Sequence, residues 1–268
     1  MIPRNLRAMI LPAVLTAWLL APGMARSQAG GSAAPAHAPG TLTMPSWQPD
    51  NAFWRGFDFK LMTDFGDLAH YHDADATVGP PAAGVNRVVF MGDSITAGWH
   101  LNVSFPGKPY INRGISGQTS PQMLLRFRQD VIDLHPKAVV ILAGTNDLAE
   151  NTGPMTLQQT ENNLMSMADL ARANGIKAVM CSVLPSTGFW WHKGLHPAAE
   201  IKVLNKWIKA YAARKGYVYV DYYSAMADAE GGLPKKFSFD GVHPNAAGQA
   251  IMSRLAEAGI EKALKGGD

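Results

Sequence analysis

Residues 87–99, RVVFMGDSITAGW, decide the fold and supply the first candidate for chemistry. The run RVVFM is short and apolar, which is typical of a strand buried on both faces of a sheet. It stops at Gly92, which allows a sharp turn, and the following Asp93 and Ser94 favour the start of a helix. A serine at such a junction lies at the carboxyl edge of a sheet, beside the partly positive start of a helix. Ser94 is therefore a helix cap or a nucleophile, and this segment alone favours neither.

The chain after Ser94 alternates between short apolar runs and patterns of helical periodicity. Strands that alternate with helices indicate an α/β fold, in which a parallel sheet carries helices on both faces. We expect about five strands, the number in flavodoxin-like doubly wound sheets. The predicted strands are 87–91, 110–112, 137–143, 177–184 and 217–222, and the predicted helices are 121–134, 157–173, 197–215 and 245–264.

Residues 1–29 have the features of a secretory signal peptide. Arg4 and Arg7 precede an apolar stretch at 8–20, and small residues allow cleavage after Ala25 or Ala29. The apolar stretch is short and interrupted for a transmembrane helix. We therefore expect a secreted or periplasmic protein with no membrane span after cleavage. An uncleaved anchor is the alternative.

The charge and the cysteine content exclude several classes of protein. Removal of the predicted signal takes three arginines and no acid, so Lys plus Arg falls from 24 to 21 and equals the 21 Asp plus Glu. A mature chain of near-zero net charge argues against a surface that binds nucleic-acid phosphates. Cys181 is the only cysteine, which excludes an internal disulfide and a zinc site built from cysteines. Its apolar neighbours predict a small buried residue.

Three further segments follow the predicted signal. Residues 30–46 are rich in Ala, Gly, Ser and Pro and predict a flexible linker. Residues 47–85 predict a helical N-terminal extension, and residues 86–268 form the main domain. An apolar stripe at helical spacing in the extension predicts a helix that packs on the main domain, with an aromatic platform for a sugar or a partner as the alternative. The stripe consists of Trp54, Phe57, Leu61, Phe65 and Leu68.

Four polar stretches lie where strands end or where the last helix begins. They are GDS at 92–94, NRGISGQ at 112–118, GTND at 144–147 and DGVHP at 240–244. Taken alone, each has a structural explanation, such as a helix cap or a polar loop. Together they contain every group that acyl transfer needs.

The roles in such a set follow from the chemistry of each residue type. Serine is a weak nucleophile, so Ser94 needs an adjacent base, which His243 would supply. Asp240, three residues earlier in the same turn, would fix the tautomer of that imidazole. The oxyanion of the tetrahedral intermediate needs preorganised donors. The backbone N–H groups of Ser94 and Gly117 and the side-chain amide of Asn146 would provide them.

The four stretches resemble the SGNH hydrolase superfamily, the GDSL-type esterase/lipase family. That family is defined by blocks carrying Ser, Gly, Asn and His, which here are Ser94, Gly117, Asn146 and His243, in the family's order. The only departure is Ile95, where the name-giving motif has leucine, and it leaves the catalytic set intact. The resemblance implies a three-layer α/β/α fold, ester hydrolysis without a metal or another cofactor, and a shallow open site.

Three further residues are candidates for substrate contact. Trp190 and Trp191 lie in the loop 186–196, and either lines an acyl or sugar subsite or packs under its rim. Arg113 could contact an acidic substrate group, although its position favours solvation at the surface. We assign Asp93 a structural role in the turn, because Asp240 already supplies the carboxylate that orients His243.

We expect a secreted serine esterase that acts on short acyl groups, with acetyl esters on carbohydrates or other small esters as substrates. The reason is that the domain has little insertion length and no long apolar lid. The first alternative is a lysophospholipase-like enzyme for longer acyl chains. A non-catalytic carbohydrate-binding module is the second, although no catalytic group is missing. A metal-dependent phosphoester hydrolase, using Asp93, Asp147, Asp240 and His243, is the third.

Overall fold

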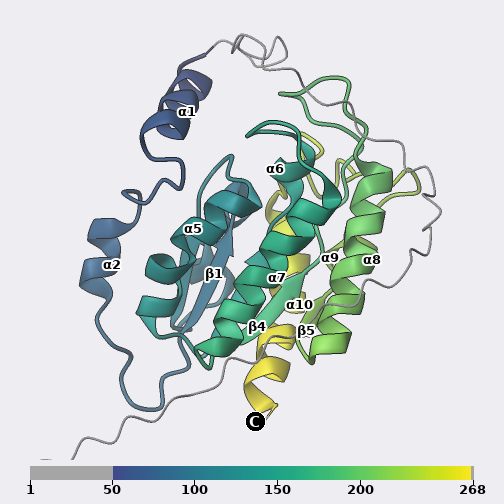
Figure 1. Cartoon of the computed structure of the whole chain (residues 1–268). Coiled ribbons are helices and arrows are strands. Elements are labelled where there is room, and N and C mark those ends of the chain that lie inside the picture. The colour runs from purple at the N-terminus through teal and green to yellow at the C-terminus, as the bar shows by residue number, and fades with distance from the viewer. Residues whose placement is uncertain (1–50, 267–268) are drawn as a thin grey trace, which may run out of the picture. The chain divides into compact units, whose positions relative to one another are not determined.

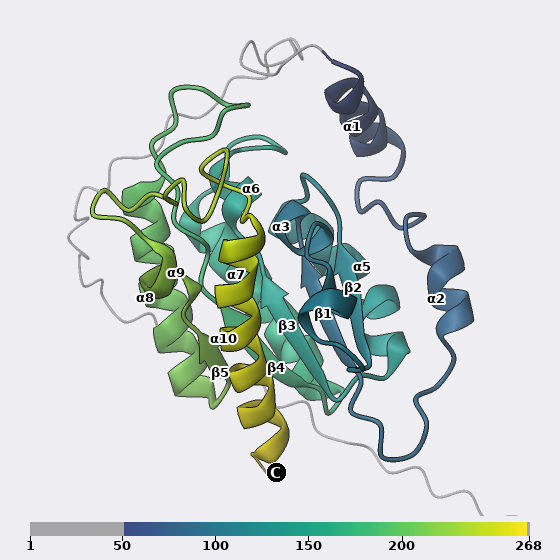
Figure 2. The same cartoon turned by 180° about the vertical axis from the view of Figure 1, so that it is seen from behind.

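The computed structural model describes residues 51–266 (Figures 1 and 2). The predicted signal, 1–29, and the predicted linker, 30–46, lie outside the described residues. Within the described part, five parallel strands form one sheet in the order β2-β1-β3-β4-β5, which confirms the predicted α/β sheet. The strands are β1 (Val88–Gly92), β2 (Tyr110–Gly114), β3 (Ala138–Leu142), β4 (Lys177–Cys181) and β5 (Val218–Val220).

The central strands are apolar because helices cover both of their faces. All residues of β1 and β3 are buried, and the two strands pair in register from Val88 with Ala138 to Gly92 with Leu142. Successive side chains point to opposite faces. Val89 and Met91 therefore join one core, while Val88 and Phe90 join the other.

The helices form the two outer layers of an α/β/α sandwich (Figures 1 and 2). The helices α5 (Ser120–Asp130), α7 (Leu157–Ala173) and α8 (Ala198–Lys215) cover one face. The long helix α10 (Ala246–Lys265) covers the other, with the short α3 (Ser94–Ala97), α4 (Leu101–Ser104) and α9 (Tyr222–Met226). The remaining short elements are η1 (Ile132–Leu134) and α6 (Thr145–Leu148). Among the described helices, none is both long and apolar enough to cross a membrane.

Gly92 ends β1 for a different reason from the one predicted. Its φ angle is not positive, so the turn itself does not require glycine. A Cβ at this position would clash with the side chain of Thr96 and would lie 2.9 Å from the carbonyl oxygen of Leu142. Glycine is therefore required because α3 folds back closely onto the end of the strand.

The N-terminal extension forms α1 (Ala52–Thr63) and α2 (His72–Val78). Trp54 and Phe57 are buried, as the predicted stripe requires. The stripe was predicted too long, because Phe65 and Leu68 lie beyond the end of α1 and are 38% and 41% exposed. Asp67, with a positive φ of 51°, turns the chain between them.

Cys181 is buried at the end of β4, as predicted. Burial raises the pKa of its thiol to about 12, against a weaker lowering by the hydrogen bond with Tyr222. Such a thiol stays protonated and unreactive at neutral pH.

Candidate active site

Three side chains from two distant segments form a hydrogen-bonded chain at the carboxyl edge of the sheet. Ser94 is the first residue of α3, directly after β1. Its Oγ lies 2.9 Å from Nε2 of His243, and Nδ1 of His243 lies 2.7 Å from Oδ2 of Asp240. If Nδ1 carries the proton toward the carboxylate, Nε2 has a free lone pair for the serine proton.

The turn that holds His243 also keeps Asp240 ionised. Oδ1 of Asp240 accepts the backbone N–H groups of Val242 and His243 at 2.9 and 2.8 Å, and the Ser238 hydroxyl at 3.1 Å. Partial burial raises the pKa of Asp240, but the hydrogen bonds from His243 and the two amides outweigh it and lower that pKa to about 2. The carboxylate is therefore negative at neutral pH and fixes the orientation of the imidazole.

The residues predicted to donate to an oxyanion, Ser94, Gly117 and Asn146, lie in three separate segments that line one cavity. Gly117 has a φ of +82°, in the left-handed region that favours glycine, and Phe57 packs 3.0 Å from where a Cβ would stand. Among the described residues, the backbone N–H groups of Ser94 and Gly117 have no hydrogen-bond acceptor. Asn146 donates one Nδ2 hydrogen to the carbonyl of Gln118 at 2.9 Å, which leaves the other for a ligand.

Asn151 connects these parts and was not predicted from the sequence. Its Nδ2 lies 3.0 Å from both the Gly117 carbonyl oxygen and Oδ1 of Asn146, and its Oδ1 accepts the indole N–H of Trp191 at 2.9 Å. It is 6% exposed. Asn151 therefore joins two predicted oxyanion donors to the loop with the tryptophans.

These residues surround a cavity of about 240 Å³. Ser94, Gly117, Asn146 and His243 line it together with Trp190 and Trp191, so the structure brings both predicted tryptophans to the site. Trp190 is 57% exposed at the rim, whereas Trp191 is buried and its ring centroid is 6.4 Å from that of His243. The wall is completed by Phe53 and Trp54 of α1, by Asn151 and by Ser116.

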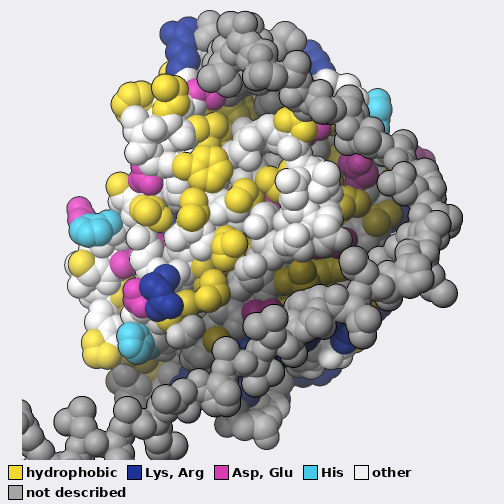
Figure 3. Space-filling model, viewed as in Figure 1, with side chains coloured by type: hydrophobic (Ala, Val, Ile, Leu, Met, Phe, Trp, Pro, Cys, Tyr) yellow, Lys and Arg dark blue, Asp and Glu magenta, His cyan; other side chains and the backbone are white. Residues whose placement is uncertain are grey.

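The aromatic residues of α1 are the main addition to the predicted site. Trp54 was predicted to pack on the domain, and it both packs and lines the cavity. Phe53 was not named as a candidate, and its ring meets that of Trp54 edge to face at 5.2 Å. Figure 3 shows hydrophobic side chains gathered beside α1, with acidic and histidine side chains toward α2.

The family model of the GDSL-like lipase/acylhydrolase family matches residues 90–251. The chain belongs to this family. It is a carboxylic ester hydrolase of the SGNH superfamily.

Several solved and curated proteins are similar to this chain. A GDSL-like lipase from Bacteroides thetaiotaomicron is 45% identical, with a TM-score of 0.73 over 75% of this chain and 100% of that one. Esterase TesA from Pseudomonas aeruginosa is 30% identical over 62% of this chain and 84% of its own length. The uncharacterized lipoprotein YqeF from Bacillus subtilis is 33% identical over 41% of this chain, and the match spans 53% of that protein.

The structure places Arg113, a candidate for substrate contact in this GDSL-like hydrolase, outside the catalytic cavity. It is 6% exposed, which contradicts the expectation of solvation at the surface. Its Nε lies 2.8 Å from Oδ1 of Asp75 in α2, and its guanidinium stacks 4.5 Å from the ring centroid of Tyr71. The side chain therefore holds the N-terminal extension against β2.

Two other carboxylates near the site, those of Asp93 and Asp147, stabilise the loops of this acylhydrolase by accepting hydrogen bonds. Asp93 is buried and accepts the N–H of Ile95 at 2.9 Å, which caps α3 and agrees with its predicted role in the turn. Asp147 accepts both the N–H and the hydroxyl of Ser120, and so joins the end of β3 to the start of α5. Burial raises the pKa of both carboxyls, that of Asp93 to about 6.

Proposed function

We propose that the protein is an exported serine esterase that hydrolyses short acyl esters, with acetyl esters of carbohydrates as substrates, through an acyl-enzyme on Ser94. The observation that carries this proposal is the hydrogen-bonded chain from Ser94 through His243 to Asp240 at a small aromatic cavity. We also propose residues 86–268 as the hydrolase domain and residues 47–85 as an extension that contributes to its cavity.

The reaction has two halves that use the same groups. Oγ of Ser94 attacks the ester carbonyl carbon, and its proton passes to Nε2 of His243. The oxyanion takes hydrogen bonds from the N–H groups of Ser94 and Gly117 and from the amide of Asn146. Collapse of the intermediate expels the alcohol, which leaves with the proton from His243. Water, activated by the same imidazole, then hydrolyses the acyl-enzyme.

The size of the cavity supports a short acyl group. Its volume of about 240 Å³ is below the range of roughly 300–1,000 Å³ that is typical of sites for drug-sized ligands. A cavity with Ser94, His243 and four aromatic rings in its wall has room for an acetyl group and one ring of the alcohol. The relative TesA is named an esterase, which is consistent with this class of reaction.

Hydrolysis of longer acyl chains is the second candidate. It is favoured by a neighbouring cavity of about 520 Å³ whose wall includes Phe53, Phe57 and Leu61. A long acyl chain would need that space in addition to the catalytic cavity. The proposal of export rests on the sequence of residues 1–29 alone.

A chain-length series tests the proposal. We expect the mature protein to hydrolyse p-nitrophenyl acetate and butyrate fastest, and Ser94→Ala to hydrolyse neither. A rate maximum at ten or more acyl carbons would support the second candidate instead. Failure of a phosphonate probe to label Ser94 would contradict the acyl-enzyme.

A further inference from the structure

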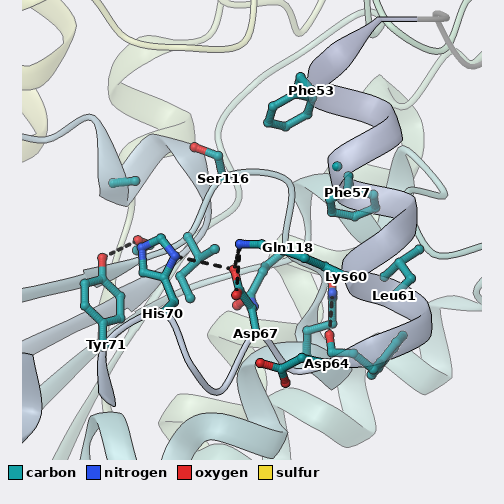
Figure 4. A pocket seen from close by; sticks show the side chains of 16 residues that line it. Phe53, Phe57, Lys60, Leu61, Asp64, Asp67, His70, Tyr71, Ser116 and Gln118 are labelled. Carbon is teal, nitrogen blue, oxygen red and sulfur yellow. Dashed lines mark hydrogen bonds and ion pairs between the residues drawn. The ribbon is translucent and has the colours of Figure 1, made fainter. Parts of the chain in front are cut away.

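A second, larger cavity lies directly beside the catalytic one. It has a volume of about 520 Å³ and lies between α1, the chain that follows α1, and the loop after β2 (Figure 4). The two cavities share Phe53 and Ser116 in their walls, so they meet at these two residues. A substrate that is too long for the catalytic cavity would enter the second one at this point.

One wall of the second cavity is apolar and is held in place by the oxyanion loop. Phe53, Phe57 and Leu61 extend from α1 toward the cavity (Figure 4). Phe57 is buried, and its ring packs where a Cβ on Gly117 would stand. The wall therefore has a fixed position relative to a predicted oxyanion donor.

The polar side of the second cavity is formed by side chains of α1 and of the chain that follows it. Nζ of Lys60 lies 2.9 and 2.8 Å from the two carboxylate oxygens of Asp67, and Nδ1 of His70 lies 3.4 Å from Oδ2 of the same residue (Figure 4). The side chains of Lys60 and His70 are 51% and 40% exposed. Asp64 and the exposed Ser116 also line this cavity.

The charges and the apolar wall together select a class of ligand. One lysine and two aspartates give this cavity a formal charge of −1 with His70 neutral, which disfavours phosphate and other anions. A hydrocarbon chain would remove water from the ion pair of Lys60 and Asp67 without replacing its hydrogen bonds. A neutral sugar ring has C–H groups for the phenylalanines and hydroxyl groups for the polar side.

We propose that the second cavity binds a neutral sugar unit adjacent to the one that carries the ester. The natural substrate is then an acylated, uncharged oligosaccharide, and the N-terminal extension supplies its second subsite. This inference rests on the proposed function, because it assumes that Ser94 deacylates a carbohydrate ester. Phe53 stands between the two sugar units.

Gly56 offers a way to fill the second cavity without a clash. It lines this cavity on α1, and a Cβ at Gly56 would have no protein atom within 4 Å. Gly56→Trp places an indole in the space of the proposed sugar unit. Met62→Trp is the matched control, since Met62 is 88% exposed on the same helix and lines neither cavity.

The experiment compares kcat/KM for acetylated xylotetraose and for xylopyranose tetraacetate, with p-nitrophenyl acetate as the measure of the chemical step. We expect the wild-type protein to prefer the tetrasaccharide by about tenfold, the effect of one moderate subsite. Gly56→Trp should remove this preference, while Met62→Trp should keep it. His70→Ala, which deletes a partly exposed imidazole from the polar side, should reduce the preference even if Gly56→Trp does not fold.

The outcomes separate this proposal from the proposed function. Absence of p-nitrophenyl acetate turnover would overturn the proposed function as a short-acyl esterase. Turnover of that ester, with equal kcat/KM for the two sugar esters, would overturn only the second subsite. If Gly56→Trp instead lowers the rate on octanoyl esters relative to acetate, the second cavity holds an acyl chain and the sugar proposal is wrong.

Discussion

The side-chain amide of Asn151 donates to Oδ1 of Asn146 at 3.0 Å. This contact fixes which end of the Asn146 amide faces the catalytic cavity, because its oxygen is held by Asn151 and its nitrogen points to Gln118 and the cavity. Since Asn151 also donates to the carbonyl oxygen of Gly117, it aligns two of the proposed oxyanion donors. Asn151 is a positioning residue in this arrangement.

Replacing Asn151 by aspartate should lower kcat with little change in KM. The introduced carboxylate would keep an acceptor for the indole of Trp191 but lose both donors, so Asn146 and Gly117 would shift. Misalignment of a preorganised site by about 1 Å typically costs on the order of 100-fold in rate. We therefore expect a fall of about 10- to 100-fold in steady-state turnover of p-nitrophenyl acetate. Asn162→Asp on the exposed face of α7 is the control, and an unchanged kcat for Asn151→Asp would refute the positioning role.

Removing the hydroxyl of Ser94 should abolish turnover and leave the fold intact. The Oγ of Ser94 contacts Nε2 of His243, and its removal leaves a partly exposed imidazole that water can solvate. Loss of a catalytic serine typically lowers kcat by about 10⁶-fold. Burst kinetics and a thermal melt on the purified variant check both halves of this prediction. Ser166→Ala, an exposed serine of α7, should match the wild-type protein in both measurements.

The sequence was sufficient to predict the sheet and the proposed catalytic groups, because short segments of the sequence determine both. The predicted strands at the centre of the sheet are continuous apolar runs. Ser94 and Asn146 lie in short motifs at edges where parallel strands end, and His243 lies in a short motif before the last helix. The topology then brings these edges together. Asp240 needs no long-range information, since it reaches His243 within one turn.

The remaining parts of the site depend on tertiary contacts that no local pattern contains. Asn151 meets Gly117 across 34 positions of the chain, and nothing in its neighbours distinguishes it from a loop asparagine. Phe53 has a role only because α1 docks beside the oxyanion loop. Arg113 is the opposite case. Its position in a motif block suggests a place in the site, but its hydrogen bond with Asp75 holds the side chain outside the catalytic cavity.

Trp190 and Trp191 should affect different kinetic constants. Trp190 is exposed at the rim, so Trp190→Ala should raise KM for an acetylated sugar by roughly threefold to tenfold, the usual effect of one aromatic contact. Trp191→Phe removes the donor to Oδ1 of Asn151 and should lower kcat instead. Both variants are compared by full Michaelis–Menten analysis. Phe59→Ala serves as the control, because Phe59 is exposed on α1 and lines neither cavity. Equal changes in KM and kcat for the two tryptophan variants would contradict these separate roles.

Asp93 should make the folded protein less stable as the pH rises from about 4 to about 6. Burial raises its pKa from 3.8 to about 6, although the hydrogen bond from Ile95 and the charge of His243 lower it in part. Between these two values the folded state holds more proton than the unfolded state, so the free energy of unfolding falls as the pH rises. Oδ2 of Asp93 is buried without a hydrogen-bond partner among the described residues, which is consistent with this cost of ionisation.

Asp93→Asn isolates this effect, because the amide oxygen still accepts the N–H of Ile95 and the group no longer titrates. Urea unfolding of both proteins at pH 4 and pH 7 should show the variant gaining stability relative to the wild-type protein as the pH rises. The gain is at most about 3 kcal/mol, since each pKa unit corresponds to about 1.4 kcal/mol.

Asp240 contributes with the opposite sign, because its pKa is lowered to about 2 and its contribution to stability is lost as the pH falls from 3.8 toward that value. Asp240 is present in both proteins, so its contribution cancels in the comparison. A difference between the two proteins that does not change with pH would mean that Asp93 ionises in the folded state as readily as in the unfolded chain.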